Sequence, residues 1–256
     1  MRAGWLLLAM ALGGCDKPGP DEPFVSRADG TLPELVVKRV DDDAISIDGI
    51  IDEAAWKSAA STGPFVSPGN GEPNKRSKVN ATARMLWSEE HLFVAITVWD
   101  KDPESPFDPE TVDPHVWAKA SGVELMLQPG DPKDNRDYYE LQVDVHGAVW
   151  DTRFDDYNKP ISGGPDDAHK RFGHQDWKSA ITRATQENDA DWVVEIALPW
   201  KSITNARVPV PPRRDDVWRA NLYSFRDGQS DALAWSPILG KGNFHKAERF
   251  GKLLFH

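Results

Sequence analysis

Trp117 is the residue whose type and position most clearly suggest binding chemistry. It lies in the segment Asp113–Gly122, ahead of an alternating apolar run, where no period-two pattern assigns its ring to a core. A planar indole face stacks well on the C–H face of a pyranose ring, whereas aromatic rings within strands are usually core. We predict core positions for four other tryptophans: Trp56, Trp87, Trp192 and Trp200. For Trp117, an exposed functional role and ordinary burial both stay open.

A run of acidic residues supplies hard oxygen atoms. It begins with Asp100 and Asp102 and continues through Glu104, Asp108 and Glu110. Calcium prefers carboxylate oxygens, so Asp100 and Asp102 are candidate calcium ligands. The run lacks the spacing of an established calcium loop, and a solvated acidic loop is the simpler explanation.

Cys15 is a candidate for lipid attachment. Arg2 and the apolar run Trp5–Leu12 precede it, followed by Gly13 and Gly14. This pattern is typical of a bacterial lipoprotein signal, and the run is far shorter than the roughly 20 residues of a bilayer-spanning helix. We expect residues 1–14 to be a signal peptide and Cys15 to anchor an exported protein to the cell envelope, with the choice of membrane left open. A plain cleavable signal, or an ordinary cysteine, is the alternative.

The sequence contains no recognisable catalytic motif. None of the seven histidines forms a His-x-x-x-His pair, and no Gly-x-Ser-x-Gly elbow is present. Cys15 is the single cysteine, so an intramolecular disulfide is excluded. Paired carboxylates are plentiful, but sequence alone does not place them. We therefore predict a binding protein rather than an enzyme.

Charge and composition narrow the partners and the domain organisation. The formal net charge of −11 argues against nucleic acid and against adhesion to anionic lipid. The segment Asp16–Pro33 contains four prolines and few large apolar side chains, which is typical of a flexible tether. We expect residues 15–33 to carry the lipid and the tether, and residues 34–256 to form one domain.

Period-two alternation dominates that domain. The predicted strands are Val79–Trp87, Leu92–Trp99, Val123–Gln128, Tyr138–Val145, Ala148–Phe154, Trp177–Ala184, Trp192–Leu198, Trp218–Phe225 and Phe250–Phe255. His146-Gly147 marks a tight hairpin turn, and helical signals are confined to Asp52–Ala59 and Pro199–Ile203. This count of strands predicts an all-β fold, a two-sheet antiparallel β-sandwich with short helices in its connections.

Several segments, taken in order, resemble the family 9 carbohydrate-binding modules. They are Ile47–Trp56, Met85–Ala95, Gly122–Leu127, Trp192–Trp200 and Glu248–Gly251, and the similarity spans roughly Ile45 to Phe255. Each segment is weakly specific alone, and their order makes the resemblance fairly specific. The resemblance implies a β-sandwich that binds a glycan at an aromatic-lined cleft.

The same resemblance implies five binding residues. In sugar-binding members of the family two tryptophans sandwich the reducing end of the ligand, and the first of them corresponds to Trp117. The glutamate that follows corresponds to Glu124. The second tryptophan of the family is replaced by Phe244 in this chain. A binding arginine of the family is replaced by Gln142, and a binding glutamine by Tyr223. Because three of the five positions differ in type, the resemblance implies the fold more firmly than the ligand.

Two other functions stay open. Related sandwiches hold haem b for electron transfer, and Met85 and Met126 are the candidate axial methionines, although methionine inside a strand is usually core. The second alternative is a lipoprotein whose sandwich contacts a protein partner at the envelope.

Overall fold

The structure, a computed structural model, describes residues 22–159, 161, 173–226 and 231–256. Cys15 and the expected signal peptide lie outside these residues, so the lipid anchor stays a prediction. Within the described part of the chain, no helix has the length and apolar character needed to cross a membrane.

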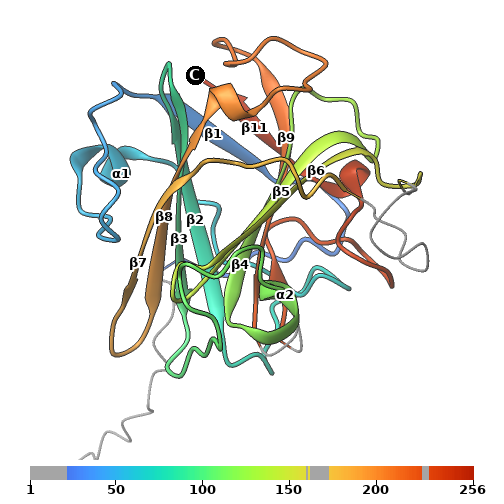
Figure 1. The fold of residues 1–256 in the computed structure, drawn as a ribbon. Coiled ribbons are helices and arrows are strands. Elements are labelled where there is room, and N and C mark those ends of the chain that lie inside the picture. The colour runs from blue at the N-terminus through green and yellow to red at the C-terminus, as the bar shows by residue number, and fades with distance from the viewer. Residues whose placement is uncertain (1–21, 160, 162–172, 227–230) are drawn as a thin grey trace, which may run out of the picture.

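Two β-sheets pack face to face (Figure 1). The first contains, in spatial order, β6 (Val149–Asp156), β5 (Arg136–Asp144), β4 (Gly122–Gln128), β9 (Val217–Phe225) and β11 (Gly251–Phe255), and β10 (Leu233–Ala234) pairs with β9. The second contains β2 (Asn80–Trp87), β3 (His91–Trp99), β8 (Trp192–Pro199) and β7 (Thr182–Glu187). The predicted two-sheet β-sandwich is thus confirmed.

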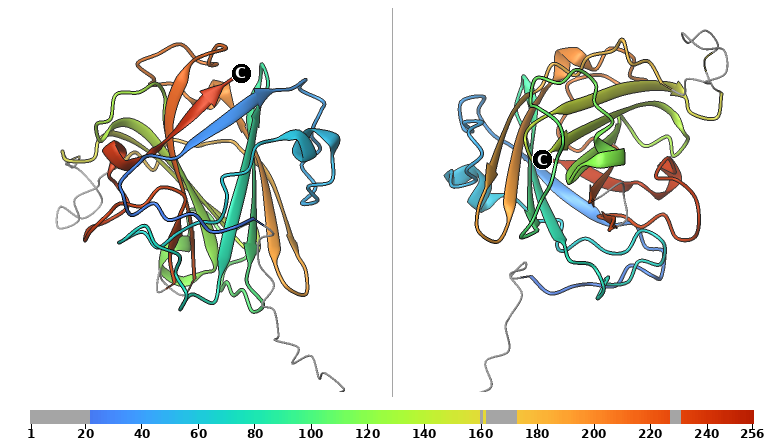
Figure 2. Two further views of the ribbon diagram at one scale, coloured as in Figure 1. Left: turned by 180° about the vertical axis from the view of Figure 1, so that it is seen from behind. Right: turned by 60° about the horizontal axis from the view of Figure 1, so that its bottom comes forward.

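Strand β1 (Glu34–Arg39) joins the two sheets along one edge. Its first part, Glu34–Val37, pairs with β11, and Lys38 and Arg39 pair with β2. Both pairings are parallel, whereas the other strand pairs are antiparallel. Figure 2 shows β1 running from the red β11 toward the teal β2. Its side chains Leu35 and Val37 alternate into the core between the sheets.

The core follows from the alternation along the strands. Trp87, Trp192 and Trp200 lie between the two sheets, as the sequence predicted. Trp56, on α1 (Ala54–Ser58), is also buried, but it packs on the outer face of the second sheet. Its indole N–H donates to the buried carboxylate of Glu195 at 2.8 Å. This small second core covers the side of that sheet that would otherwise meet water.

The short elements agree with the sequence in part. The predicted turn of helix at Pro199–Ile203 is the 3₁₀ helix η1 (Trp200–Ser202), and Gly147 has a φ of +89° in the hairpin between β5 and β6. The strand predicted at Trp177–Ala184 is wrong in its boundaries, because β7 begins only at Thr182. Trp177 instead packs on Tyr139, with 5.0 Å between the ring centroids. The structure adds two short helices, α2 (Val116–Lys119) and η2 (Ala247–Arg249).

Part of the segment expected to be a tether is bonded to the domain. The Arg27 guanidinium donates to the carbonyls of Thr62 and Pro64, each at 3.0 Å. The carbonyl of Gly30 accepts from the Arg249 side chain at 2.8 Å. Residues 27–33 therefore lie on the sandwich, and the flexible tether stays a prediction for the residues that precede them.

Candidate functional site

The outer face of the first sheet carries a row of large polar and aromatic side chains. In the strand register Trp150 lies opposite Gln142, Gln142 opposite Glu124, and Glu124 opposite Tyr223. Neighbouring residues such as Val123 point the other way, into the core. Alternation therefore places Gln142, Glu124 and Tyr223 side by side on the face directed away from the second sheet.

Helix α2, which carries Trp117, lies against β5 of this sheet (Figure 1). The Trp117 backbone N–H donates to Oε1 of Gln142 at 3.1 Å. Val116 is buried against Phe225, and this close approach depends on Gly122, because a Cβ there would lie 2.8 Å from Cγ1 of Val116. The buried Val116 thus holds helix α2 in place, while 41% of the Trp117 surface is exposed.

Gln142 connects two carboxyl groups. Its Nε2 donates to Oε2 of Glu124 at 3.0 Å and to Oε1 of Glu140 at 2.7 Å. The side chains of Glu124 and Glu140 are only 1% and 3% exposed. Glu124 Oε1 and Glu140 Oε2 accept no hydrogen bond from the described residues. Buried polar atoms of this kind usually find a partner, so these two oxygens mark a place where a hydrogen-bonding group is missing.

The electrostatics of this pair are set by burial. Burial raises the pKa of Glu140 from 4.5 to about 8. Burial, and then the charge of Glu140, raise the pKa of Glu124 well above its ordinary value. His245 lies near, with Nε2 3.8 Å from Oε2 of Glu140, but burial lowers the pKa of His245 to about 3. Because the imidazole stays neutral, it does not balance the carboxylates, and the pair retains protons at neutral pH.

Aromatic rings surround the acid pair. Tyr223 and Phe244 stack in parallel, with centroids 4.0 Å apart and 4° between the planes. Trp117 stacks on His115, with 6.0 Å between the centroids. No ring contact joins Trp117 to Phe244 in the described part of the chain. Phe244 therefore covers Tyr223 instead of facing Trp117 across an open slot.

Two residues of the site were missed from the sequence. Glu140 lies two residues before Gln142 on β5, so both side chains point to the same face of the sheet. The period-two alternation of a strand was the one feature of the sequence that could have predicted this. His245 accepts or donates at the Tyr138 hydroxyl, with 2.7 Å between Nδ1 and the oxygen, and it stacks on Tyr157 at 3.8 Å. Its position depends on contacts between segments far apart in sequence.

Comparison with known proteins identifies the family. The model of the family described as "Carbohydrate family 9 binding domain-like" matches residues 47–255. The chain belongs to this family. No curated protein sequence matches the chain.

Three solved structures share the fold of this family 9-like domain. A putative carbohydrate-binding protein from Bacteroides uniformis has a TM-score of 0.65 at 16% identity, over 88% of this chain and 100% of that one. A family 9 module from Caldicellulosiruptor kristjanssonii, in complex with cellotriose, has a TM-score of 0.57 at 13% identity over 87% and 93%. The same kind of module in complex with glucose has a TM-score of 0.55 at 13% identity over 87% and 95%.

The family 9-like domain brings all five predicted binding residues into one connected group. Glu124, Gln142 and the Trp117 backbone form one hydrogen-bonded chain, and Tyr223 is paired in register with Glu124. Phe244 is connected to this group through its stack on Tyr223. That these five residues bind a ligand stays a prediction.

The candidate calcium ligands lie elsewhere in the family 9-like domain. Asp100 is buried, and its Oδ1 accepts from Arg226 at 2.8 Å and from the Asp102 backbone N–H at 3.1 Å. Arg226 thus already supplies the positive charge that calcium would bring. In the described residues, the group of side chains close enough to share an ion is Asp42, Glu90 and His91.

The candidate haem ligands are packed side chains. Met85 is fully buried between the sheets, and Met126 lies in an apolar cluster with Tyr138, Phe154 and Tyr223. Both methionines fill space among aromatic and aliphatic neighbours, in keeping with their expected role as core.

Proposed function

We propose that this domain binds a carbohydrate at the outer face of its first sheet and does not transform it. The observation that carries the proposal is the hydrogen-bonded chain from the exposed Trp117 through Gln142 to two buried carboxyl groups that each keep one oxygen unbonded. Membership of the family 9-like domains, and a shared fold with modules in complex with cellotriose and glucose, support it.

The two kinds of side chain suit the two surfaces of a sugar ring. The exposed indole of Trp117 takes up the C–H face and removes it from water. Glu124 and Glu140, held in their protonated form, donate from Oε1 and Oε2 to hydroxyl oxygens of the sugar, which gives two buried polar atoms their missing partners. In this proposal Phe244 leaves Tyr223 when the ligand enters and forms the opposite wall.

The placement of the carboxyl groups favours binding over hydrolysis. Glycoside hydrolases place two carboxyl groups on opposite sides of the scissile bond, about 5–10 Å apart. Glu124 and Glu140 lie on adjacent strands of one sheet face and share a single amide donor. Both therefore approach a ligand from the same side, so one cannot act as the acid while the other attacks or activates water from the opposite face.

Calorimetric titration with glucose and cellotriose tests the proposal. We expect the chain to bind at least one of them, and Trp117→Ala and Glu124→Gln to weaken binding by about tenfold or more, about 1.4 kcal/mol. Phe24→Ala is the matched control, because Phe24 is another aromatic side chain with 41% exposure and has no contact with this face. Equal loss in Phe24→Ala, or binding unchanged in Trp117→Ala, would refute the proposed site.

We also propose that the domain works while anchored through Cys15 to the cell envelope. The apolar run and small residues before Cys15 support this location. Metabolic labelling with a radiolabelled fatty acid is expected to mark the chain, and Cys15→Ser to abolish the label. Label retained in Cys15→Ser, or a soluble wild-type chain without label, would contradict it.

A further inference from the structure

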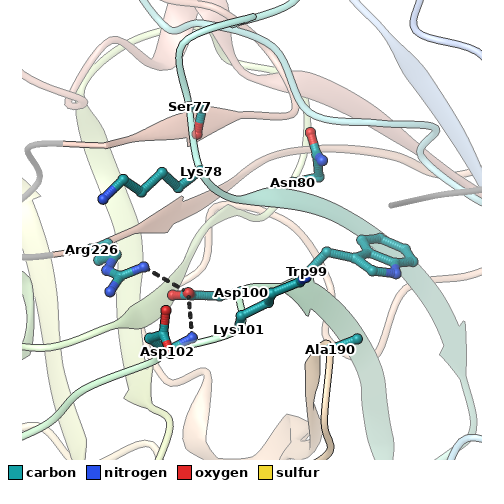
Figure 3. A pocket seen from close by; sticks show the side chains of 9 residues that line it. All are labelled: Ser77, Lys78, Asn80, Trp99, Asp100, Lys101, Asp102, Ala190 and Arg226. Carbon is teal, nitrogen blue, oxygen red and sulfur yellow. Dashed lines mark hydrogen bonds and ion pairs between the residues drawn. The ribbon is translucent and has the colours of Figure 1, made fainter. Parts of the chain in front are cut away.

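A cavity lies at the end of the sandwich where both sheets contribute. It has a volume of about 220 Å³ and is lined by residues around the start of β2, the end of β3, the end of β9 and the β7–β8 turn (Figure 3). Its lining consists of Ser77, Lys78, Asn80, Trp99, Asp100, Lys101, Asp102, Ala190 and Arg226. None of these residues belongs to the Trp117–Glu124 site, so the two sites are separate.

One wall of the cavity is an aromatic ring. Trp99 is the last residue of β3, partly exposed, and Asn80 lies directly opposite it in the register of β2 and β3. The indole N–H of Trp99 makes no hydrogen bond within the described residues. An indole wall beside an amide side chain is suited to a ligand with one apolar face and polar edges.

The side of the cavity away from Trp99 carries Lys78 and Arg226, with Asp100 and Asp102 beside the guanidinium (Figure 3). Figure 3 shows Lys78 extending toward the side where Arg226 lies, away from Trp99. Arg226 is fixed by Asp100, with 2.8 Å between Nη1 and Oδ1. The Lys78 ammonium forms no ion pair within the described residues, and Asp231 accepts only from the Lys78 backbone N–H. Lys101 and Asp102 are exposed at the rim.

Basic side chains exceed acidic ones by one in the lining of this cavity. Lys78, Lys101 and Arg226 outnumber Asp100 and Asp102 among its lining residues, although the chain as a whole carries −11. In the first site the two carboxyl groups of the floor hold protons at neutral pH, and the neutral His245 adds no positive charge there. A ligand carrying one negative charge is therefore attracted to the Trp99 cavity and finds no such attraction at the first site.

We propose that this cavity binds a carboxylated sugar ring, a hexuronate. The ring stacks on Trp99, the carboxylate pairs with the Lys78 ammonium on the Arg226 side, and hydroxyls bond to Asn80 and Ser77. The volume is below the roughly 300–1,000 Å³ of sites for drug-sized ligands, so it suits a single ring. This goes beyond the proposed function, because it adds a second site that prefers an anionic sugar.

The test follows tryptophan indole N–H signals in ¹⁵N-labelled protein by NMR. Glucuronate and glucose form a matched pair, since they differ only in the group at C6. We expect glucuronate to shift the Trp99 signal, which Trp99→Phe identifies by its loss, at concentrations roughly two- to fivefold lower than glucose requires. Lys78→Gln is expected to remove this preference, and Lys75→Gln, a change of an exposed lysine outside the cavity lining, to keep it.

The same spectra separate this proposal from the proposed function. Cellotriose is expected to shift the Trp117 signal and to leave the Trp99 signal unchanged, so each site is read independently. Added salt is expected to weaken glucuronate binding, because it screens the exposed Lys78 charge. The proposal is overturned if glucuronate leaves the Trp99 signal in place, if glucose shifts it equally well, or if Lys78→Gln keeps the preference.

Discussion

Replacing Glu140 by glutamine is expected to stabilise the fold, and increasingly so as the pH rises. In the folded chain burial raises the pKa of Glu140 from 4.5 to about 8. At pH 7 the folded state holds this proton, whereas the unfolded chain has lost it. Glu140 therefore does not lower the free energy of unfolding below about pH 4.5. Between about pH 4.5 and about 8 the free energy of unfolding falls progressively, because the unfolded chain releases the proton that the folded chain keeps.

The size of the effect follows from the difference between the two pKa values. The pKa of Glu140 in the unfolded chain, 4.5, is 2.5 units below pH 7. At 1.36 kcal/mol per unit, keeping the proton in the folded state costs about 3 kcal/mol of unfolding free energy at pH 7. A glutamine carries no such cost, and its Oε1 can still accept from Gln142. Allowing for imperfect packing, we expect Glu140→Gln to gain about 1–3 kcal/mol at pH 7, or roughly 2–10 °C in Tm for a domain of this size.

Urea unfolding of the two proteins at pH 4.5, 6, 7 and 8 measures this difference. The free energies of unfolding are expected to converge at pH 4.5 and to separate progressively above it. Glu110→Gln is the control, because Glu110 is exposed, and it is expected to follow the wild type. A Glu140→Gln variant that is destabilised equally at every pH, or whose difference from wild type is independent of pH, would show that Glu140 is ionised in the fold.

Three further substitutions test how the site and its support are built. Gly122→Ala places a Cβ 2.8 Å from Val116 Cγ1, so we expect a loss of about 1–3 kcal/mol and weaker cellotriose binding through a displaced α2, measured by urea unfolding and calorimetry. Gln142→Ala removes the donor shared by the two carboxyl groups, and we expect a similar loss that grows with pH; a constant loss would contradict this role. Trp56→Phe leaves Glu195 Oε1 without its indole donor, and we expect a loss of about 1–3 kcal/mol with sugar binding unchanged; altered affinity would connect the two faces.

The strands could be predicted because alternation is a local signal. Eight of the nine predicted runs coincide with β2, β3, β4, β5, β6, β8, β9 and β11 to within a few residues. The parallel pairings of β1 could not be predicted, since they depend on which distant strands close the edge of the sandwich. The strand predicted from Trp177 was wrong for a related reason. The alternating residues before Thr182 form no strand, and the Trp177 ring packs on Tyr139 in a tertiary contact.

The site could be predicted only in outline. Alternation and the family resemblance placed Glu124 on the polar face of its strand, and the register of β4 and β5 then set Gln142 against it. Sequence did not reveal that Gln142 would be shared with Glu140, because that requires the register and the rotamers together. The stack of Phe244 on Tyr223 likewise depends on how the chain after β10 folds back over the sheet.

A crystal structure of the protein with cellotriose tests the central claim most directly. The account predicts a sugar ring stacked on Trp117, with hydroxyl oxygens about 2.6–3.2 Å from Glu124 Oε1 and Glu140 Oε2 and with Phe244 moved off Tyr223. A ligand bound away from the outer face of the first sheet, or on that face without contact to Trp117 and Glu124, would contradict it.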